Sequence, residues 1–326
     1  MKRTLSSIAF AMLMIMILPL HARAARLLVP MGKLIGLQLS DDTVMIVAFD
    51  DVLGGNARHA GLKIGDQLVQ LEDHPIRSTQ DVRNILDHCD NNVDITIRRG
   101  GKLHTFAVEP NETSEGKKLG IHLRQGIAGV GTITWYDPEN GTFGALGHGV
   151  STPKGSLLAM TSGNAYHARI QSVLRGKSGE PGQLRGASDA AFPCGELFRN
   201  TPQGVFGITR ERWLGEPLPV AGHEEMHPGP ATIRSTVSGS SVQEYYVEIL
   251  NIYPKDRSDN RNLLIRVTDP ILLNTTGGIV QGMSGSPIIQ DGKLVGAVTH
   301  VLVNDPTRGY GIFIENMLDA AESGVN

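Results

Sequence analysis

Gly282-Met283-Ser284-Gly285-Ser286-Pro287 is the stretch of this chain on which the interpretation of the rest depends. A serine framed by glycines lies where the backbone must turn sharply, so the Ser284 hydroxyl points outward. The amide N–H groups of Gly282 and Ser284 can then converge on the point where a substrate oxyanion forms, because glycine permits that backbone at low steric cost. The hexapeptide predicts Ser284 as a nucleophile and Gly282 with Ser284 as its oxyanion hole. Ser286 is interpreted as a structural residue of the same turn.

A serine hydroxyl is a poor nucleophile until a base takes its proton. The chain has 11 histidines, and His148 stands out because Gly147 and Gly149 flank it. Flanking glycines allow the imidazole to lie at the mouth of a cleft. His148 also precedes Ser284 in a β-rich region, which is the order of base and nucleophile in chymotrypsin-like proteases. We therefore expect His148 to be the base.

The base needs a carboxylate to fix its tautomer and to stabilise the imidazolium. Asp269 lies 15 residues before Ser284 and follows the apolar stretch 263–267, which reads as a strand. It is the predicted third member of the site, and Asp137 and Asp189 are the alternatives. An aspartate at a strand end before a proline can also be a simple turn residue.

Two stretches near the N-terminus resemble a PDZ domain. Residues 60–69 read AGLKIGDQLV, and Leu34-Ile35-Gly36-Leu37 precedes them. The resemblance implies that Leu34, Ile35, Gly36 and Leu37 form the loop that binds a peptide carboxylate through backbone N–H groups. The partner it implies is a peptide ligand. A helix is expected from Thr79 to His88, where apolar residues recur at helical spacing.

The expected fold is mostly β. It places a small α+β PDZ domain at 27–109, a polar linker at 110–118, and a chymotrypsin-like double β-barrel serine peptidase domain at 119–326. The barrel is expected because short β runs alternate with glycine turns from residue 120 onward, among the 39 glycines of the chain.

Residues 1–25 are typical of a targeting segment. Lys2 and Arg3 precede an apolar run at 8–20, and Ala22-Arg23-Ala24 fits an A-x-A cleavage site. The sequence allows a cleaved signal peptide or a retained membrane anchor. In either case the rest of the chain is predicted to be exported.

Several other readings are disfavoured by composition and context. The net charge is -3 and aromatic residues make up 5% of the chain, so no nucleic-acid partner is expected. Cys89 and Cys194 are expected to be separate thiols. His223-Glu224-Glu225-Met226-His227 spells H-E-x-x-H, but the prolines on both sides prevent the long helix that a zinc protease needs. Neither a metal nor a cofactor is predicted.

Four blocks of sequence are similar to the stage IV sporulation protein B peptidase family. They are residues 145–150 (ALGHGV), 275–287 (TTGGIVQGMSGSP), 296–301 (GAVTHV) and 303–306 (VNDP). The resemblance extends to the order of export segment, PDZ domain and peptidase domain. It implies Ser284 as the nucleophile, His148 as the base and Asp269 as the third residue. His300, in the third block, either lines the substrate pocket or is a structural rim residue.

The function that the resemblance implies is that of a signalling serine endopeptidase. It would act between the two forespore membranes, cleave its own N-terminal region, and clip a membrane-associated regulatory complex. That cleavage would free an intramembrane protease that matures a late mother-cell sigma factor. A general exported PDZ-serine quality-control protease and a non-catalytic PDZ adaptor remain the alternatives.

Overall fold

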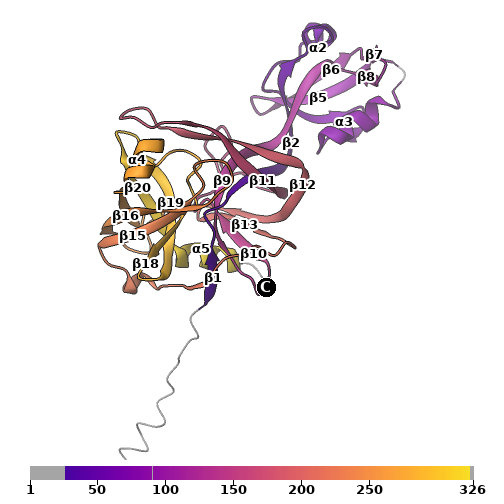
Figure 1. Cartoon of the computed structure of the whole chain (residues 1–326). Helices are drawn as coiled ribbons and strands as arrows, with labels where there is room; N and C mark the ends of the chain where they lie inside the picture. The colour runs from indigo at the N-terminus through magenta and orange to yellow at the C-terminus, as the bar shows by residue number, and fades with distance from the viewer. Residues whose placement is uncertain (1–25, 90, 324–326) are drawn as a thin grey trace, which may run out of the picture.

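The structure is a computed structural model, and it describes residues 26–89 and 91–323 (Figure 1). Two β-barrels form the body, and a smaller unit stands out from one of them. The expected mostly β fold with a PDZ unit and a double β-barrel is confirmed. The predicted targeting segment at 1–25 lies outside the described residues. Among the described helices, none is long and apolar enough to cross a membrane.

The first barrel is a ring of six antiparallel strands that closes where β2 pairs with β9. Around the ring the strands are β9 (Ile121–Tyr136), β10 (Thr142–Ala145), β13 (Gly204–Ile208), β12 (Gln183–Thr201), β11 (Ser162–Leu174) and β2 (Leu34–Phe49). β1 (Leu27–Pro30) and β14 (Leu218–Pro219) extend it at β9. Side chains such as Phe143 and Ile35 fill its interior.

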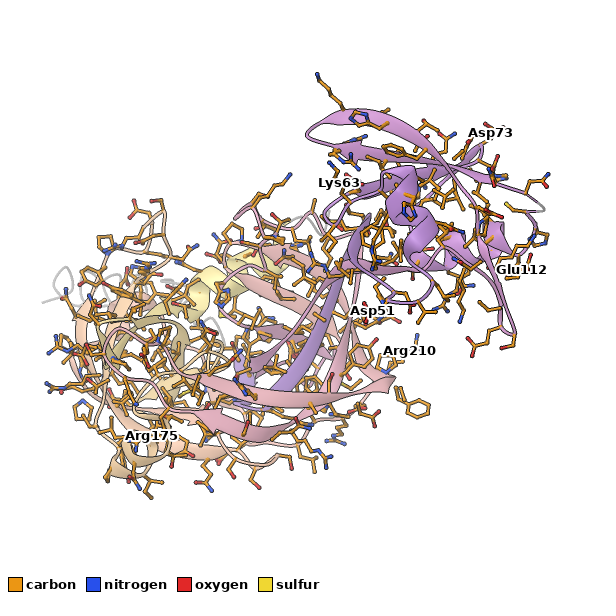
Figure 2. The ribbon with its side chains drawn as sticks, turned by 90° about the horizontal axis from the view of Figure 1, so that it is seen from above. Asp51, Lys63, Asp73, Glu112, Arg175 and Arg210 are labelled. Atoms are coloured by element: carbon orange, nitrogen blue, oxygen red, sulfur yellow. The ribbon has the colours of Figure 1, made fainter. Side chains whose placement is uncertain are left out.

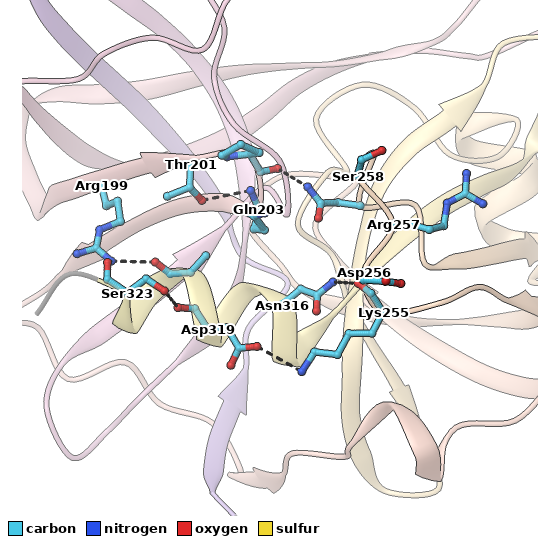
Figure 3. Close-up of a pocket in the computed structure, with 13 residues that line it drawn as sticks. Arg199, Thr201, Gln203, Lys255, Asp256, Arg257, Ser258, Asn316, Asp319 and Ser323 are labelled. Atoms are coloured by element: carbon cyan, nitrogen blue, oxygen red, sulfur yellow. Dashed lines mark hydrogen bonds and ion pairs between the residues drawn. The ribbon is translucent and has the colours of Figure 1, made fainter.

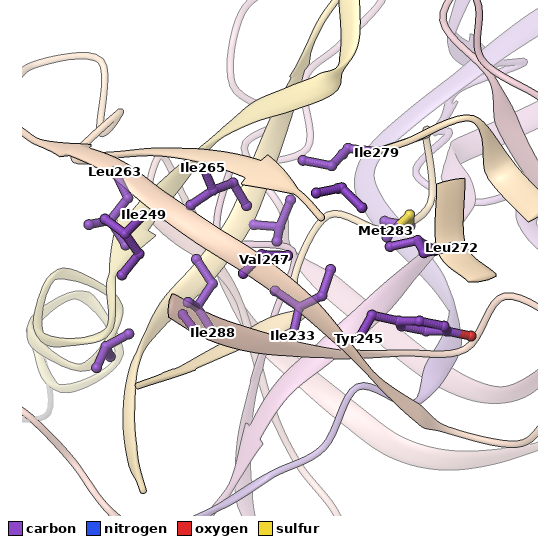
Figure 4. Packing of buried hydrophobic residues seen from close by; sticks show 14 of the residues in the cluster. Ile233, Tyr245, Val247, Ile249, Leu263, Ile265, Leu272, Ile279, Met283 and Ile288 are labelled. Carbon is purple, nitrogen blue, oxygen red and sulfur yellow. The ribbon is translucent and has the colours of Figure 1, made fainter. Parts of the chain in front are cut away.

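The second barrel is also closed. Its strands, in ring order, are β15 (Gly229–Ser235), β16 (Gln243–Ile252), β17 (Leu263–Val267), β20 (Asp305–Phe313), β19 (Lys293–Leu302) and β18 (Pro287–Gln290). The helices α4 (Pro270–Thr276) and α5 (Ile314–Glu322) and the 3₁₀ turn η1 (His223–Glu225) accompany it. Figure 4 shows its apolar interior, in which Met283 of the serine turn and Leu272 of α4 lie together. The serine turn is therefore anchored in this core.

The PDZ unit is built on the outer halves of β2 and β9. It adds β3 (Gln67–Leu71), β4 (His74–Pro75), β5 (Val93–Arg99), β6 (Lys102–Val108), β7 (Asn111–Thr113), β8 (Gly116–Lys118), α2 (Gly55–Ala60) and α3 (Thr79–Leu86). Seen from above, it projects away from the barrels, with Lys63, Asp73 and Glu112 on its outer surface (Figure 2). The predicted helix at 79–88 is confirmed and ends slightly earlier. Ser78 and Asp81 form its capping box.

The motif AGLKIGD owes its stability to a buried ion pair. Asp66 is buried and accepts two hydrogen bonds from Arg99, at 2.7 and 2.6 Å, and one from the amide of Lys63 at 2.8 Å. Although burial alone would raise the pKa of Asp66, the Arg99 and Lys63 bonds lower it below its ordinary value. Loss of Arg99 would leave an uncompensated buried charge.

Two predicted boundaries are wrong. Residues 27–43 do not belong to the PDZ unit, because β1 and the first half of β2 pair with β9 and β11 inside the first barrel. Residues 110–118 are not a linker, since β7 and β8 form a hairpin that packs near α3. The PDZ unit is thus an insertion between two paired barrel strands rather than a domain that precedes the barrel.

Substitution of Gly36 tests whether this part of β2 lies in the wall of the first barrel. An added Cβ at Gly36 would lie 2.6 Å from Cβ of Ser188, whereas one at Gly129 would meet nothing within 4 Å. The two glycines lie at adjacent positions of the β2–β9 ladder. We expect Gly36→Ala to lower the free energy of unfolding by about 1–3 kcal/mol through overpacking. Gly129→Ala should leave it unchanged or slightly raised.

Chemical denaturation of both variants measures this difference. Equal stability of the two variants would contradict the assignment of Gly36 to the barrel wall.

Candidate active site

The serine turn is fixed by β9 of the first barrel, although its core contacts are in the second. The Thr132 hydroxyl donates to the carbonyl of Gly282 at 2.9 Å, and the Thr132 amide donates to the carbonyl of Ser284 at 3.1 Å. Gly285 has a φ of +96°, and a Cβ there would lie 2.0 Å from the Thr132 carbonyl oxygen. The close approach of β9 therefore requires glycine after the nucleophile.

Two amides of the serine turn are the predicted donors of the oxyanion hole. Gly282, at a φ of +98°, and Ser284 donate to no backbone or side-chain acceptor among the described residues. The amides of Met283, Gly285 and Ser286, by contrast, all have backbone acceptors. Preorganised donors left free in this way are what an oxyanion hole needs. The geometry is compatible with the predicted role of Gly282 and Ser284.

The two serines of the turn have different surroundings. The Ser284 hydroxyl is half-buried and donates to the carbonyl of Thr299 at 2.9 Å. Ser286 is fully buried and donates to the Ser235 hydroxyl at 3.0 Å. Only Ser284 can be reached by a substrate, which agrees with the structural interpretation of Ser286.

His148 is presented by a strained loop at the end of β10. Leu146 and Gly147 have consecutive φ values of +70° and +68°, and the Leu146 amide donates to the carbonyl of Thr132 at 3.1 Å. An added Cβ at Gly147 would lie 2.9 Å from the side chain of Thr299. The histidine loop and the serine turn therefore meet around the same two threonines. Positive φ at a non-glycine residue such as Leu146 is typical of functional loops.

A residue that sequence reasoning missed positions this loop. The side chain of Asn200, on β12, accepts from the amide of Val150 at 2.8 Å. It donates to the carbonyls of Val150 and Leu158, both at 2.9 Å. All its hydrogen bonds go to the loop that follows His148, so we assign Asn200 as a positioning residue. Nothing in the sequence near position 200 indicates this contact, because the two segments are about 50 residues apart.

The surroundings of the His148 ring are compatible with its predicted role as the base, although the described residues include no hydrogen bond between His148 and Ser284. Its Nδ1 lies 3.0 Å from the carbonyl of Gly149, so the proton belongs on Nδ1 and Nε2 is left as the acceptor. Burial is the main cause that lowers the pKa of His148 below 6.5. A lowered pKa favours the neutral ring that a general base needs. The ring of His300 lies beside it, with 5.4 Å between centroids.

Asp269 is not brought into contact with His148. It caps the N-terminus of α4, where one carboxylate oxygen accepts from the amides of Ile271 and Leu272, both at 2.9 Å. The other oxygen accepts from the amide of Tyr246 at 3.3 Å. This structure uses the carboxylate for capping, and Leu272 of the capped helix packs in the core with Met283. Asp269 therefore supports the serine turn through α4.

The two alternative carboxylates are also engaged elsewhere. Asp137 is buried and pairs with Arg26 at 3.2 Å, and Asp189 accepts from the amide of Ala191. Within residues 26–89 and 91–323, no carboxylate forms a hydrogen bond with His148. The structure shows the base and nucleophile regions assembled around Thr132 and Thr299, with the Gly149 carbonyl in the place where a third residue would bind.

The H-E-x-x-H stretch forms the single short turn η1, as its prolines predict. His223 points to Glu315, with 2.8 Å between Nδ1 and the carboxylate, whereas His227 pairs with Asp291 at 2.9 Å. The two histidines thus have different partners, and the described residues include no cluster suited to a metal ion.

Comparison with known proteins supports the peptidase assignment. The profile described as SpoIVB peptidase S55 matches residues 115–318, which include both His148 and Ser284. The chain belongs to the SpoIVB peptidase S55 family. A PDZ-domain profile matches residues 52–99, in the inserted unit. The protein is accordingly a serine peptidase with a PDZ domain.

More distant likenesses are limited in extent. The chain is similar to the inactive form of the Rv3671c protease of M. tuberculosis, at 13% identity and a TM-score of 0.35, over 60% of this chain and 85% of that one. It is also similar to the HtrA-type protease AlgW bound to a decapeptide, at 11% identity and a TM-score of 0.37, over 65% and 57%.

A Bartonella henselae protein whose name calls it a candidate zinc metalloprotease is 26% identical over 100 residues. This match spans 29% of the present chain and 27% of that relative.

The predicted PDZ carboxylate loop is misplaced. Leu34, Ile35, Gly36 and Leu37 are buried in the first barrel, and both edges of their strand are paired, with β9 and with β11. No peptide can add there. The error has a simple cause, because apolar-Gly-apolar stretches recur along the chain and Leu119-Gly120-Ile121, rather than Ile35-Gly36-Leu37, lines the groove.

The groove of the PDZ unit lies between α3 and the start of β9. It has a volume of about 710 Å³. Its floor includes Leu119, Gly120 and Ile121, and its α3 wall includes Val82 and Leu86. Gly120 has a φ of +67°, as a tight turn into a strand requires. Ile121 and the residues after it pair with β2 on one edge and face α3 on the other. A peptide strand can therefore add along β9 here.

Substitution of Asp269 separates its capping role from the predicted triad role. Asparagine caps helices about as well as aspartate, and alanine does not. We expect Asp269→Asn to keep kcat within about tenfold of wild type, and Asp269→Ala to lower the free energy of unfolding by roughly 1–2 kcal/mol. Peptide hydrolysis and thermal unfolding of both variants measure this. A loss near 10⁴ in kcat for a normally stable Asp269→Asn protein would instead place Asp269 in a triad.

The pH dependence of hydrolysis reports the state of His148. The base must be neutral to accept the Ser284 proton, so activity is lost as the pH falls through the pKa of His148. Because burial lowers this pKa, the acidic limb of kcat/KM should have its midpoint below 6.5. A midpoint above 6.5 would mean that an anion faces the ring in the free enzyme.

Proposed function

We propose that this protein is a sporulation signalling endopeptidase. It would cleave its own N-terminal region and a membrane-associated regulatory complex, and thereby trigger the intramembrane proteolysis that activates a late mother-cell sigma factor. The observation that carries the proposal is a serine peptidase site of the SpoIVB family joined by a continuous strand to a PDZ groove. The proposed location is the space between the two forespore membranes, and the sequence pattern at 1–25 supports export to it.

The groove supports selective rather than general proteolysis. It opens to solvent between α3 and β9, away from Ser284, so a target held there is recognised at a distance from the bond that is cut. A target bound at both places gains affinity by effective concentration. This arrangement suits an enzyme that cuts a few chosen proteins.

Self-cleavage provides the test. Purified wild-type protein should give discrete fragments from its N-terminal region, identified by mass spectrometry of the termini. Ser284→Ala should give none, because loss of a serine nucleophile costs on the order of 10⁶ in turnover. Ser286→Ala is the matched control, and it should still cleave itself while losing some stability. Addition of EDTA should change nothing.

A second arm tests the signalling role. In sporulating cells, Ser284→Ala should block maturation of the sigma factor while Ser286→Ala supports it. Broad degradation of casein by the purified enzyme, or normal sigma-factor maturation with Ser284→Ala, would contradict the proposal.

A further inference from the structure

One edge of β19 is open beside the nucleophile. The pairing of β18 with β19 ends at Pro287 and Ala297. The backbone groups of Val298 then bond to the serine turn, and the Thr299 carbonyl accepts from Ser284. From His300 onward, β20 covers one edge of β19, and no described strand covers the other. An exposed strand edge at this place is a site where an extended peptide can add.

The direction of the added peptide follows from the barrel. Every strand pair in the barrel is antiparallel. A substrate that adds antiparallel to β19 places its reacting carbonyl at Ser284. The substrate residues that precede the scissile bond then lie alongside residues 300–302. The side chain one position before the reacting residue then lies beside His300.

His300 is turned toward this position by a β-bulge. The register of β19 with β20 shifts between Val298 and His300, and bulges of this kind re-aim side chains next to active sites. The His300 ring is exposed at the surface and packs beside His148. Burial of the rest of the ring, followed by the effects of His148 and Arg261, lowers the pKa of His300 to about 4. It is a neutral hydrogen-bond donor at physiological pH.

Arg261 places a positive charge near His300. Its guanidinium lies 5.1 Å from the centroid of the Tyr310 ring, and Tyr310 is the cross-strand partner of His300. Its side chain forms no ion pair with any described residue. The nearby Asp259 accepts two hydrogen bonds from the Arg257 guanidinium, at 2.9 and 2.8 Å, and one from the Arg261 amide at 3.2 Å, so two arginines share this one carboxylate.

The loop that carries Arg261 is well fixed. The buried side chain of Asn262 donates to the carbonyls of Pro254 and Lys255. Lys255 pairs with Asp319 of α5 at 3.3 Å, as Figure 3 shows. The backbone that carries Arg261 is therefore held in place by these contacts.

We propose that His300 and Arg261 form, beside His148, the subsite for the substrate side chain immediately before the reacting residue. This subsite selects a carboxylate and thereby determines the specificity of cleavage. A substrate glutamate or aspartate would accept from the His300 imidazole and would neutralise Arg261. A hydrogen bond to an ionised acceptor is stronger than one between neutral groups, so the acid is preferred over its amide.

Peptide cleavage tests the proposal without knowledge of the natural target. A library of peptides from digested unrelated proteins is incubated with the wild-type enzyme, and the cleaved bonds are read by mass spectrometry. Matched synthetic peptides with Glu, Gln or Leu at the position before the reacting residue then give ratios of kcat/KM. We expect acidic residues to be enriched at that position, with Glu preferred over Gln by about tenfold, which corresponds to about 1.4 kcal/mol.

Variants of single residues show which side chains cause the preference for Glu over Gln. Arg261→Gln should bring the Glu/Gln ratio close to one, and His300→Gln should reduce it in part. Arg308→Gln is the matched control, because Arg308 is an exposed arginine of β20 that pairs with Asp305. It removes the same charge and should leave the ratio unchanged. Thermal unfolding confirms that each variant is folded.

Two results would overturn the proposal. No enrichment of acidic residues at that position in the wild-type library would do so, as would an unchanged Glu/Gln ratio in Arg261→Gln. If a variant turns over too slowly for kcat/KM, the rates at which Glu- and Gln-containing peptidyl phosphonates label Ser284 give the same ratio.

Discussion

The pairing of β2 with β9 is the constraint on which the rest of the molecule depends. Its ladder runs from Leu34 opposite Thr132 to Phe49 opposite Ile121. The inner half closes the first barrel, and the outer half is the base of the PDZ unit. Between the inner and outer halves, the register of β2 against β9 shifts. Asp42 and Gly126 adopt positive φ values there, of +57° and +72°. A Cβ at Gly126 would lie 1.9 Å from the Leu39 carbonyl oxygen, so only glycine allows the strands to stay together there.

The same strand contacts both the serine turn and the histidine loop. Near one end, β9 forms the floor of the PDZ groove at Ile121. Near the other, Thr132 bonds to both Gly282 and Ser284 and accepts from Leu146, two residues before His148. Neither barrel alone holds the site, because the histidine loop comes from the first and the serine turn from the second. Thr132 is the residue at which the two meet.

The chemistry could be predicted from sequence more fully than the architecture could. The glycines around Ser284 and His148 meet conformational requirements of the backbone beside them, so they form a pattern that is visible in the sequence. The insertion of the PDZ unit leaves none, because the pairing of β2 with β9, two strands far apart in the chain, is decided by packing. Leu34–Leu37 and Leu119–Ile121 are similar as sequences, and only the ladder shows which one belongs to the groove. Asn200 and the capping role of Asp269 depend on distant neighbours in the same way.

The insertion also orders the events of folding. During synthesis β2 is complete long before β9, so the first barrel cannot close until the whole PDZ segment has been made. Closing a loop of that length by chance would cost conformational entropy. A PDZ segment that folds early brings the outer halves of β2 and β9 into register, and the inner halves then need only to extend a ladder that already exists. An early-folding recognition unit would in this way shorten the loop that the first barrel has to close.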